Sequence, residues 1–143
     1  MKKIFLADLK ELTEEQIKEH IVEDYSGELS EGRYFAEEGN EVEKKELRKK
    51  LKDFHILIAY ESVGSYGCDS SSFFLLKEKK TGKLFENHAS HCSCYGFEGQ
   101  WKPEETTIQY LKSDKFYFHS GGYDGDEEGN SQKVLDYIKN LSD

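Results

Sequence analysis

The sequence has no long apolar run and only one proline in its 143 residues. A membrane-spanning helix needs roughly 18 consecutive apolar residues, and no run approaches that length. Near the N-terminus the apolar stretch is only IFLA, residues 4–7, before Asp8 interrupts it, which is too short for the core of a signal peptide. Aromatic residues make up 13% of the chain and supply material for a core, so disorder is also excluded. We therefore expect a folded, cytoplasmic protein without membrane contact.

Cysteine is scarce as well. Three cysteines, an odd number, do not make a disulfide framework and fit a reducing compartment. The length is that of one domain, and it is sufficient to bury a core without covalent crosslinks. We expect a single domain over residues 1–143.

Basic residues are outnumbered, with 20 Lys and Arg against 29 Asp and Glu and a net charge of −9. Residues 11–43 hold 12 carboxylates against Lys18 and Arg33, a net charge of −10, and a basic run follows at 44–52. Such a surface excludes direct binding of nucleic acid over a broad face, because phosphate contacts need positive charge. Two interpretations stay open. The acids only keep a small protein in solution, or they occupy a basic groove on another protein.

Hydrophobic spacing and capping signals predict an α+β fold with a mostly antiparallel sheet of about four strands packed by helices. Capping boxes, Thr13 with Gln16 and Asn40 with Glu43, mark the starts of two helices. The expected parts are an acidic helical part over 1–54, a strand-rich part with a Cys/Gly turn over 55–120, and a C-terminal helix over 131–142. We expect strands at 55–62, 71–78, 83–90 and 115–120. Residues 27–40 are expected to form a long connection, in which 33–36 is a candidate for a short strand. A further helix is expected to start at Pro103, with Glu104 and Glu105 in its first turn.

The most unusual stretch is SHCSCYGFEGQW, residues 90–101. His88, His91, Cys92 and Cys94 are the residue types that zinc prefers, with Cys68 as a distant fifth. However, only one residue separates Cys92 from Cys94, and thiols two apart on a strand stand roughly 7 Å apart, too far for one zinc ion unless the chain bends. Zinc is therefore an alternative and not the leading interpretation.

Two other interpretations of this stretch remain. Cys92 or Cys94 could be a nucleophile beside a histidine base, although no oxyanion-hole motif is legible. The favoured interpretation is a packed structural turn, in which small residues allow close approach and Phe97 and Trp101 anchor the turn in the core. In that turn Glu98 and Gln100 are expected to supply hydrogen bonds to the backbone.

The stretch SHCSCYGFEGQWKPEETT, residues 90–107, resembles a segment of small proteins of phages and prophages of low-GC bacteria. Those proteins share a Ser-His-Cys-Ser-Cys-Tyr-Gly run followed by Gln-Trp and Pro-Glu, after two strands. The resemblance covers roughly residues 55–111 and leaves 1–54 and 115–143 outside. It implies a mobile-element accessory protein. The family brings no established activity, so no residue role is carried over.

These observations lead us to expect a non-enzymatic protein that binds a host protein stoichiometrically, as a counter-defence inhibitor of the anti-CRISPR or nucleic-acid-mimic kind. The expected partner has a basic surface, such as that of a nuclease. The carboxylates expected to contact it are Glu14, Glu15, Glu19 and Glu23 in the first helix, and Asp124, Asp126, Glu127 and Glu128 in a loop. A zinc-binding module is the alternative and a cysteine-dependent enzyme is the third hypothesis. No catalytic residue is predicted, and no cofactor other than zinc.

Overall fold

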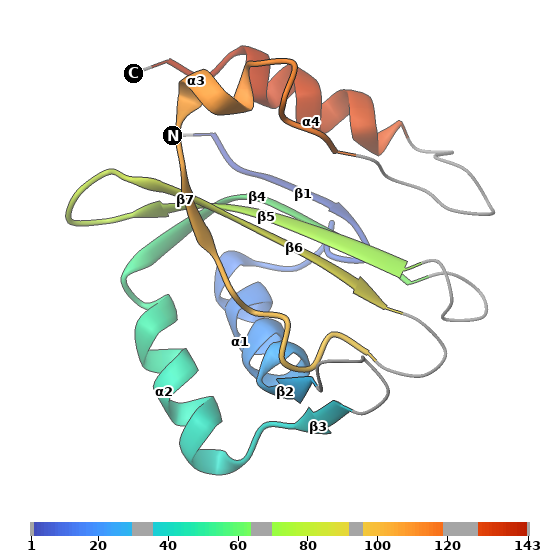
Figure 1. The fold of residues 1–143 in the computed structure, drawn as a ribbon, viewed down its shortest axis with the longest axis vertical. Coiled ribbons are helices and arrows are strands. Elements are labelled where there is room, and N and C mark those ends of the chain that lie inside the picture. The colour runs from blue at the N-terminus through green and yellow to red at the C-terminus, as the bar shows by residue number, and fades with distance from the viewer. Residues whose placement is uncertain (1, 30–35, 64–69, 92–95, 119–128, 143) are drawn as a thin grey trace.

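The protein is a single α+β domain in three layers. The computed structural model describes residues 2–29, 36–63, 70–91, 96–118 and 129–142. Within these residues, a five-stranded sheet lies between two helical layers, with α1 and α2 on one face and α3 and α4 on the other (Figure 1). The helices are α1 (Glu14–Tyr25), α2 (Glu41–Leu51), α3 (Ile108–Leu111) and α4 (Asn130–Lys139).

The sheet is mixed and mostly antiparallel, in the order β1-β4-β5-β6-β7. Its strands are β1 (Ile4–Ala7), β4 (Phe54–Ser62), β5 (Ser70–Glu78), β6 (Leu84–His91) and β7 (Glu104–Thr106). Only the β1–β4 pair is parallel, with Ile4 opposite Ile58. A separate antiparallel hairpin, β2 (Gly27–Leu29) and β3 (Ala36–Glu38), follows α1.

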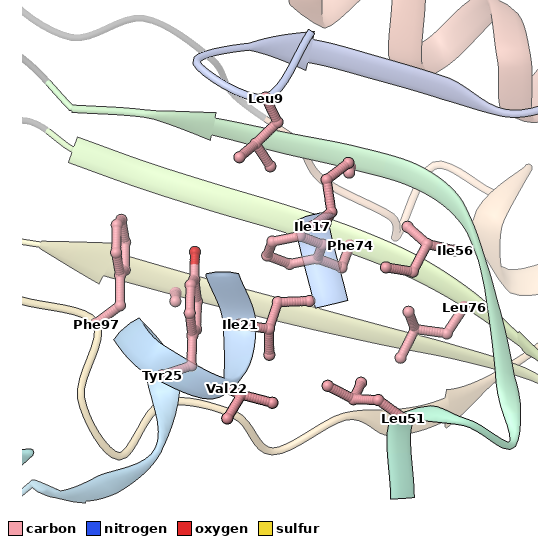
Figure 2. Packing of buried hydrophobic residues seen from close by; sticks show 12 residues of the cluster. Leu9, Ile17, Ile21, Val22, Tyr25, Leu51, Ile56, Phe74, Leu76 and Phe97 are labelled. Atoms are coloured by element: carbon pink, nitrogen blue, oxygen red, sulfur yellow. The ribbon is translucent and has the colours of Figure 1, made fainter. Parts of the chain in front are cut away.

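The alternation of side chains along the central strands builds two cores. On β5, Phe74 faces α1 and α2 while Phe73 faces α4, and both are fully buried. A β-bulge between Ile56 and Ile58 on β4 shifts the register, so Leu57 and Ile58 both join the core under α4. Figure 2 shows the other core, where Ile17 and Ile21 of α1 pack beside Phe74 on this face of the sheet. Burying each such side chain contributes about 1.5–3 kcal/mol.

Both capping boxes are confirmed. The Thr13 hydroxyl accepts from the Gln16 N–H, and the Gln16 side chain accepts from the Thr13 N–H. Asn40 and Glu43 repeat the arrangement at the start of α2. These reciprocal bonds satisfy N–H groups that a helix start leaves unpaired, which explains why both helices begin where their sequences indicate.

The expected fold class, α+β with a mostly antiparallel sheet of about four strands, is confirmed, and the sheet of the described residues has five strands. One of them was not expected, because IFLA at 4–7 forms β1 and pairs with β4. Two local expectations were wrong. Residues 104–106 form β7 along β6 and not the first turn of a helix, and the helix starts after Thr107, whose hydroxyl caps α3. Part of the predicted connection 27–40 is the β2–β3 hairpin, and Ala36, the last residue of the expected 33–36 strand, begins β3.

The predicted strand at 115–120 is also wrong over its described part. Residues 116–118 have the alternation of a strand, with Phe116 buried and Tyr117 74% exposed, but no neighbouring strand pairs with them. Phe116 and Phe118 instead pack edge-on or tilted against Phe73. An alternation of apolar and polar residues indicates which side chains are buried. It does not show that the segment pairs with a neighbouring strand. Residues 119 and 120 lie outside the described residues.

In the part of the chain that the structure describes, no helix is long and apolar enough to span a membrane.

The hairpin gives a test of the fold. Gly27 has φ +115°, and an added Cβ would meet the Glu37 carbonyl oxygen at 1.9 Å. We expect Gly27→Ala to lower the free energy of unfolding by more than about 2 kcal/mol, from strain and backbone displacement. Gly129→Ala is the matched control, since Gly129 also has a positive φ, +66°, but nothing lies within 4 Å of its Cβ. The Gly129→Ala substitution should lower the free energy of unfolding by only about 1 kcal/mol. Urea unfolding measures both, and equal losses would contradict the packing described for Gly27.

Candidate functional site

The four α1 carboxylates expected to contact a partner do not form one free surface. The Glu14 side chain is only 15% exposed, and it lies against Lys3 and the Ile56 N–H. Burial alone would raise the pKa of Glu14, but these hydrogen bonds and the nearby lysines outweigh it and hold that pKa below its usual range. Glu15, at 86% exposed, is the most open of the four and lies 3.9 Å from Lys18.

Glu19 and Glu23 are ion-paired with the basic run of α2. Arg48 holds Glu19 with two hydrogen bonds, of 2.6 and 2.9 Å, a bidentate geometry that is stronger than a single contact. The Arg48 hydrogen bond lowers the pKa of Glu19. Lys44 lies 3.0 Å from Glu23 and 3.3 Å from Glu38. Glu19 and Glu23 therefore stabilise the contact between α1 and α2. That the α1 carboxylates contact a partner protein remains a prediction.

Two further carboxylates face each other on the β2–β3 hairpin. Glu28 lies directly opposite Glu37 in the antiparallel register, and both are exposed. Like charges directly opposite on paired strands are destabilising. Within the described residues, no cation lies within ion-pair distance of either one. We call Glu28 and Glu37 the hairpin carboxylates.

A buried carboxylate, Glu61 of β4, joins α1 to the sheet. Its side chain is 6% exposed, and it accepts a hydrogen bond from the Tyr25 hydroxyl. His20 Nε2 lies 2.9 Å from both Glu61 oxygens, and His20 Nδ1 lies 3.5 Å from Asp24. A buried charge without such partners would cost several kcal/mol, so these contacts are a condition for burying Glu61 at all.

The network shifts the pKa of each of its α1 members upward. The hydrogen bond that His20 donates to Glu61 is the main cause that raises the pKa of His20, against the effect of burial. Burial, followed by the Glu61 charge, raises the pKa of Tyr25 well above its usual value. Burial also raises the pKa of Asp24. At neutral pH the phenol is protonated and donates to Glu61, while only His20, with a side chain 25% exposed, and Asp24 meet solvent. The arrangement stabilises the α1–β4 contact and gives His20 a charge that depends on pH.

The unusual 90–101 stretch packs onto this network. Phe97 is 4% exposed and stacks on Tyr25 with ring centroids 4.9 Å apart and planes 3° from parallel (Figure 2). The Gly99 N–H donates to the Tyr25 carbonyl at 3.0 Å. Trp101 packs edge-on against both Tyr25 and Phe74. The contacts of residues 96–101 therefore match the favoured interpretation, a packed turn.

Hydrogen bonds from two side chains fix the backbone of this turn, as expected. The Gln100 amide accepts from the Ser90 N–H at 2.9 Å, and donates to the Ser90 carbonyl at 2.6 Å and to the Gly96 carbonyl at 2.8 Å. The Glu98 carboxylate accepts from the Gly96 N–H at 2.9 Å. The cysteines between Ser90 and Gly96 lie outside the described residues, so the nucleophile hypothesis for Cys92 and Cys94 stays a prediction.

Only one side chain of the predicted zinc set is described. His88 donates or accepts at Glu86, 2.9 Å away, and its ring lies 4.8 Å from that of Phe73. Burial would raise the pKa of Glu86, but the contacts with His88 and Thr106 hold it below its usual range. The side chain of His91 and all of Cys92 and Cys94, like Cys68, lie outside the described residues. Across the described ranges, no group of three or more His, Cys, Asp and Glu is placed to hold a metal ion.

The second predicted acidic contact, Asp124, Asp126, Glu127 and Glu128, also lies outside the described residues. Sequence reasoning missed the Glu61 network, although one signal was present. Glu61 is a charged residue within the apolar strand run HILIAYE, where a buried acid needs partners. No spacing rule identifies His20 and Tyr25 as those partners, because they come from a helix 36 to 41 residues away.

A comparison of the chain with protein-family models, with curated proteins and with solved structures found no match.

The His20–Glu61 contact predicts a pH dependence of stability. A histidine whose pKa is raised on folding stabilises the protein fully below its unfolded pKa, near 6.5, and this contribution is lost as pH rises through the higher folded value. We expect His20→Gln to lower the free energy of unfolding at pH 6 by about 1.5–3 kcal/mol, the range for a hydrogen bond to a charged group. At pH 8.5 the difference from wild type should shrink. The control is His55→Gln. The His55 side chain is 45% exposed and lies 3.7 Å from Glu14, and its replacement should change the pH dependence of the free energy of unfolding little. Parallel profiles for wild type and His20→Gln would contradict the assignment.

Removing the Gln100 amide tests the structural interpretation of the turn. We expect Gln100→Ala to lower the free energy of unfolding by about 1–3 kcal/mol, because three hydrogen bonds to the Ser90 and Gly96 backbone are lost. Gln109→Ala, at an exposed position of α3, should be near neutral. Thermal and urea unfolding report both changes. A metal-held turn would behave differently, with a Gln100→Ala variant close to wild type and a wild-type melting temperature that falls in chelator.

Proposed function

We propose that this protein is a non-enzymatic binding protein that acts stoichiometrically on a partner protein with a basic surface. The contact surface is centred on the hairpin carboxylates, Glu28 and Glu37, which are both exposed. The observation that supports this choice is the like-charge pair itself, exposed and in register.

The contrast between the hairpin and α1 supports the proposal. Glu19 and Glu23 each have a cation supplied by α2, from Arg48 and Lys44. The hairpin carboxylates have no such cation among the described residues, although like charges directly opposite each other on paired strands are destabilising. A lysine or arginine from a partner, placed between the two carboxylates, would remove this repulsion on binding. Binding energy is then gained from an arrangement that is unfavourable in the free protein.

The base of the hairpin packs closely against the end of α1. The Ser26 hydroxyl donates to the Val22 carbonyl at 2.7 Å, so the chain is anchored to α1 as it leaves the helix. Ser26 and Gly27 then pack against Gly39, where an added Cβ would come within 2.3 Å of the Ser26 hydroxyl. Anchoring at the base reduces the ordering that binding would require of the two glutamates.

Carboxylates at defined spacing fit a protein surface that normally binds phosphates. In the proposal, the partner is a host protein with a lysine- and arginine-rich groove, such as a defence nuclease, and this protein occupies the groove in place of nucleic acid. The resemblance of residues 55–111 to phage and prophage proteins is what suggests a bacterial host partner. The mode of action is then a counter-defence inhibition of the anti-CRISPR or nucleic-acid-mimic kind.

Charge reversal on the hairpin tests this function. The wild-type protein is immobilised on a support and incubated with a lysate of a natural bacterial host, from which it should capture a partner. Capture should weaken as the salt concentration rises, because exposed charges are screened beyond about 10 Å at 0.1 M. Glu28→Lys/Glu37→Lys should abolish the capture. The matched control is Glu46→Lys/Glu104→Lys, which makes the same change in net charge at two other exposed positions and should keep it.

A second readout separates mimicry from general charge attraction. Excess duplex DNA or RNA should release the captured partner if both bind the same groove. The proposal is overturned if the hairpin reversal leaves capture intact, or if the control reversal removes it equally. Circular dichroism should show both variants folded, since the substituted side chains are exposed.

A further inference from the structure

A groove lies between α4 and the sheet, on the face opposite α1 and α2. Its volume is 1060 Å³, which is of the size that holds small-molecule ligands. The apolar side chains that line it are all aliphatic: Ile4, Leu6, Leu57, Leu84, Ile108 and Leu141. The β-bulge contributes to this lining, because it turns Leu57 as well as Ile58 toward the α4 side of the sheet.

Cations surround this apolar lining. Four lysines line the groove, Lys2, Lys77, Lys83 and Lys133, against two carboxylates, Glu105 and Asp136. Lys83 is already paired with Glu105 at 3.4 Å. Asp136 accepts a hydrogen bond from Gln132 at 2.7 Å. For Lys2, Lys77 and Lys133, no carboxylate of the described residues lies within ion-pair distance.

The local charge runs against that of the whole protein. The protein carries a net charge of −9, yet three lysines without an ion-pair partner among the described residues line this groove beside its buried and half-buried apolar side chains. That combination is complementary to a ligand with a negative head and an apolar body.

We infer that the groove binds a long-chain alkyl carboxylate, that is, a fatty acid. The aliphatic lining favours an alkyl chain over a nucleobase, which would stack on aromatic rings. The only aromatic residue of the lining is Tyr137, and its hydroxyl is already bonded to the Lys2 carbonyl. The carboxylate head is held among Lys2, Lys77 and Lys133, and the chain lies along the leucine and isoleucine side chains. This inference does not depend on the acidic contact proposed above, which lies on the other face.

The direct test is calorimetric titration of the full chain with dodecanoate below its micelle concentration. We expect binding of one molecule per chain. Dodecyltrimethylammonium, with the same chain and a positive head, should bind at least about tenfold more weakly, because it is repelled by the lysines that attract the carboxylate. Butyrate, which has the head without the long chain, should show no measurable binding.

Paired variants locate the site. Lys77→Glu/Lys133→Glu should weaken dodecanoate binding about tenfold or more, since each lost ion pair contributes up to about fivefold and the two new carboxylates repel the ligand head. Lys45→Glu/Lys49→Glu, on the exposed side of α2, is the control and should leave the affinity within about twofold. Leu141→Asp places a charge in the apolar lining and should abolish binding, whereas Leu135→Asp, at an exposed position of α4 outside the groove, should not.

Methyl resonances of the isoleucines and leucines that line the groove should shift during the titration, which keeps the test valid if one variant is unstable. Three results would overturn the inference: equal affinity for the cationic surfactant, unchanged affinity in Lys77→Glu/Lys133→Glu, or shifts confined to the α1–α2 side. Saturating inorganic phosphate that blocks dodecanoate completely would indicate an anion site without an alkyl site and would also overturn it.

Discussion

The burial of one carboxylate, Glu61, sets the position of the acidic half of the molecule. A negative charge at this depth in the sheet is tolerated only because Tyr25 and His20 both reach it from α1. These two contacts fix the rotation of α1 on the sheet. The same rotation presents the Tyr25 ring to Phe97, which seats the unusual turn, and turns Glu19 and Glu23 toward α2. Helix packing, turn structure and surface charge therefore share one buried cause.

The ion pairs of the described residues are unevenly divided between the two sides of the sheet. On one side, Lys44 and Arg48 of α2 pair with Glu23 and Glu19 of α1, and no cation of the described residues reaches the hairpin carboxylates. On the other side, lysines from the N-terminal segment, β5 and α4 line a groove together with apolar side chains. The net charge of −9 gives no indication of this distribution, because it sums over the whole chain.

Local signals in the sequence predicted the local structure well. The fold class, both capping boxes, the strands at 71–78 and 83–90 and the backbone bonds of Gln100 were all predicted, since each depends on residues close in the chain. What could not be predicted depends on distant pairing. The four residues of β1 are too few for a periodicity, and β7 is a strand only because the edge of β6 lies beside it. The hydrogen-bond partners of Glu61, and the α2 cations that pair with the acids of α1, could not be predicted for the same reason, because only the fold brings these residues together.

The edges of the sheet have a consequence for behaviour at high concentration. An open edge offers unpaired N–H and C=O groups to another chain, and β4 and β5, the most apolar strands, sit in the middle, away from both edges. β7 pairs with β6 only over Leu84 to Glu86, so the later part of β6 has no strand beside it among the described residues. There the Gln100 amide accepts from the Ser90 N–H and donates to its carbonyl, and the Asn87 side chain accepts from the Lys102 N–H. The Gln100 side chain thus takes the place of a neighbouring strand at Ser90, and both backbone groups of that residue are occupied and closed to β-pairing with another chain.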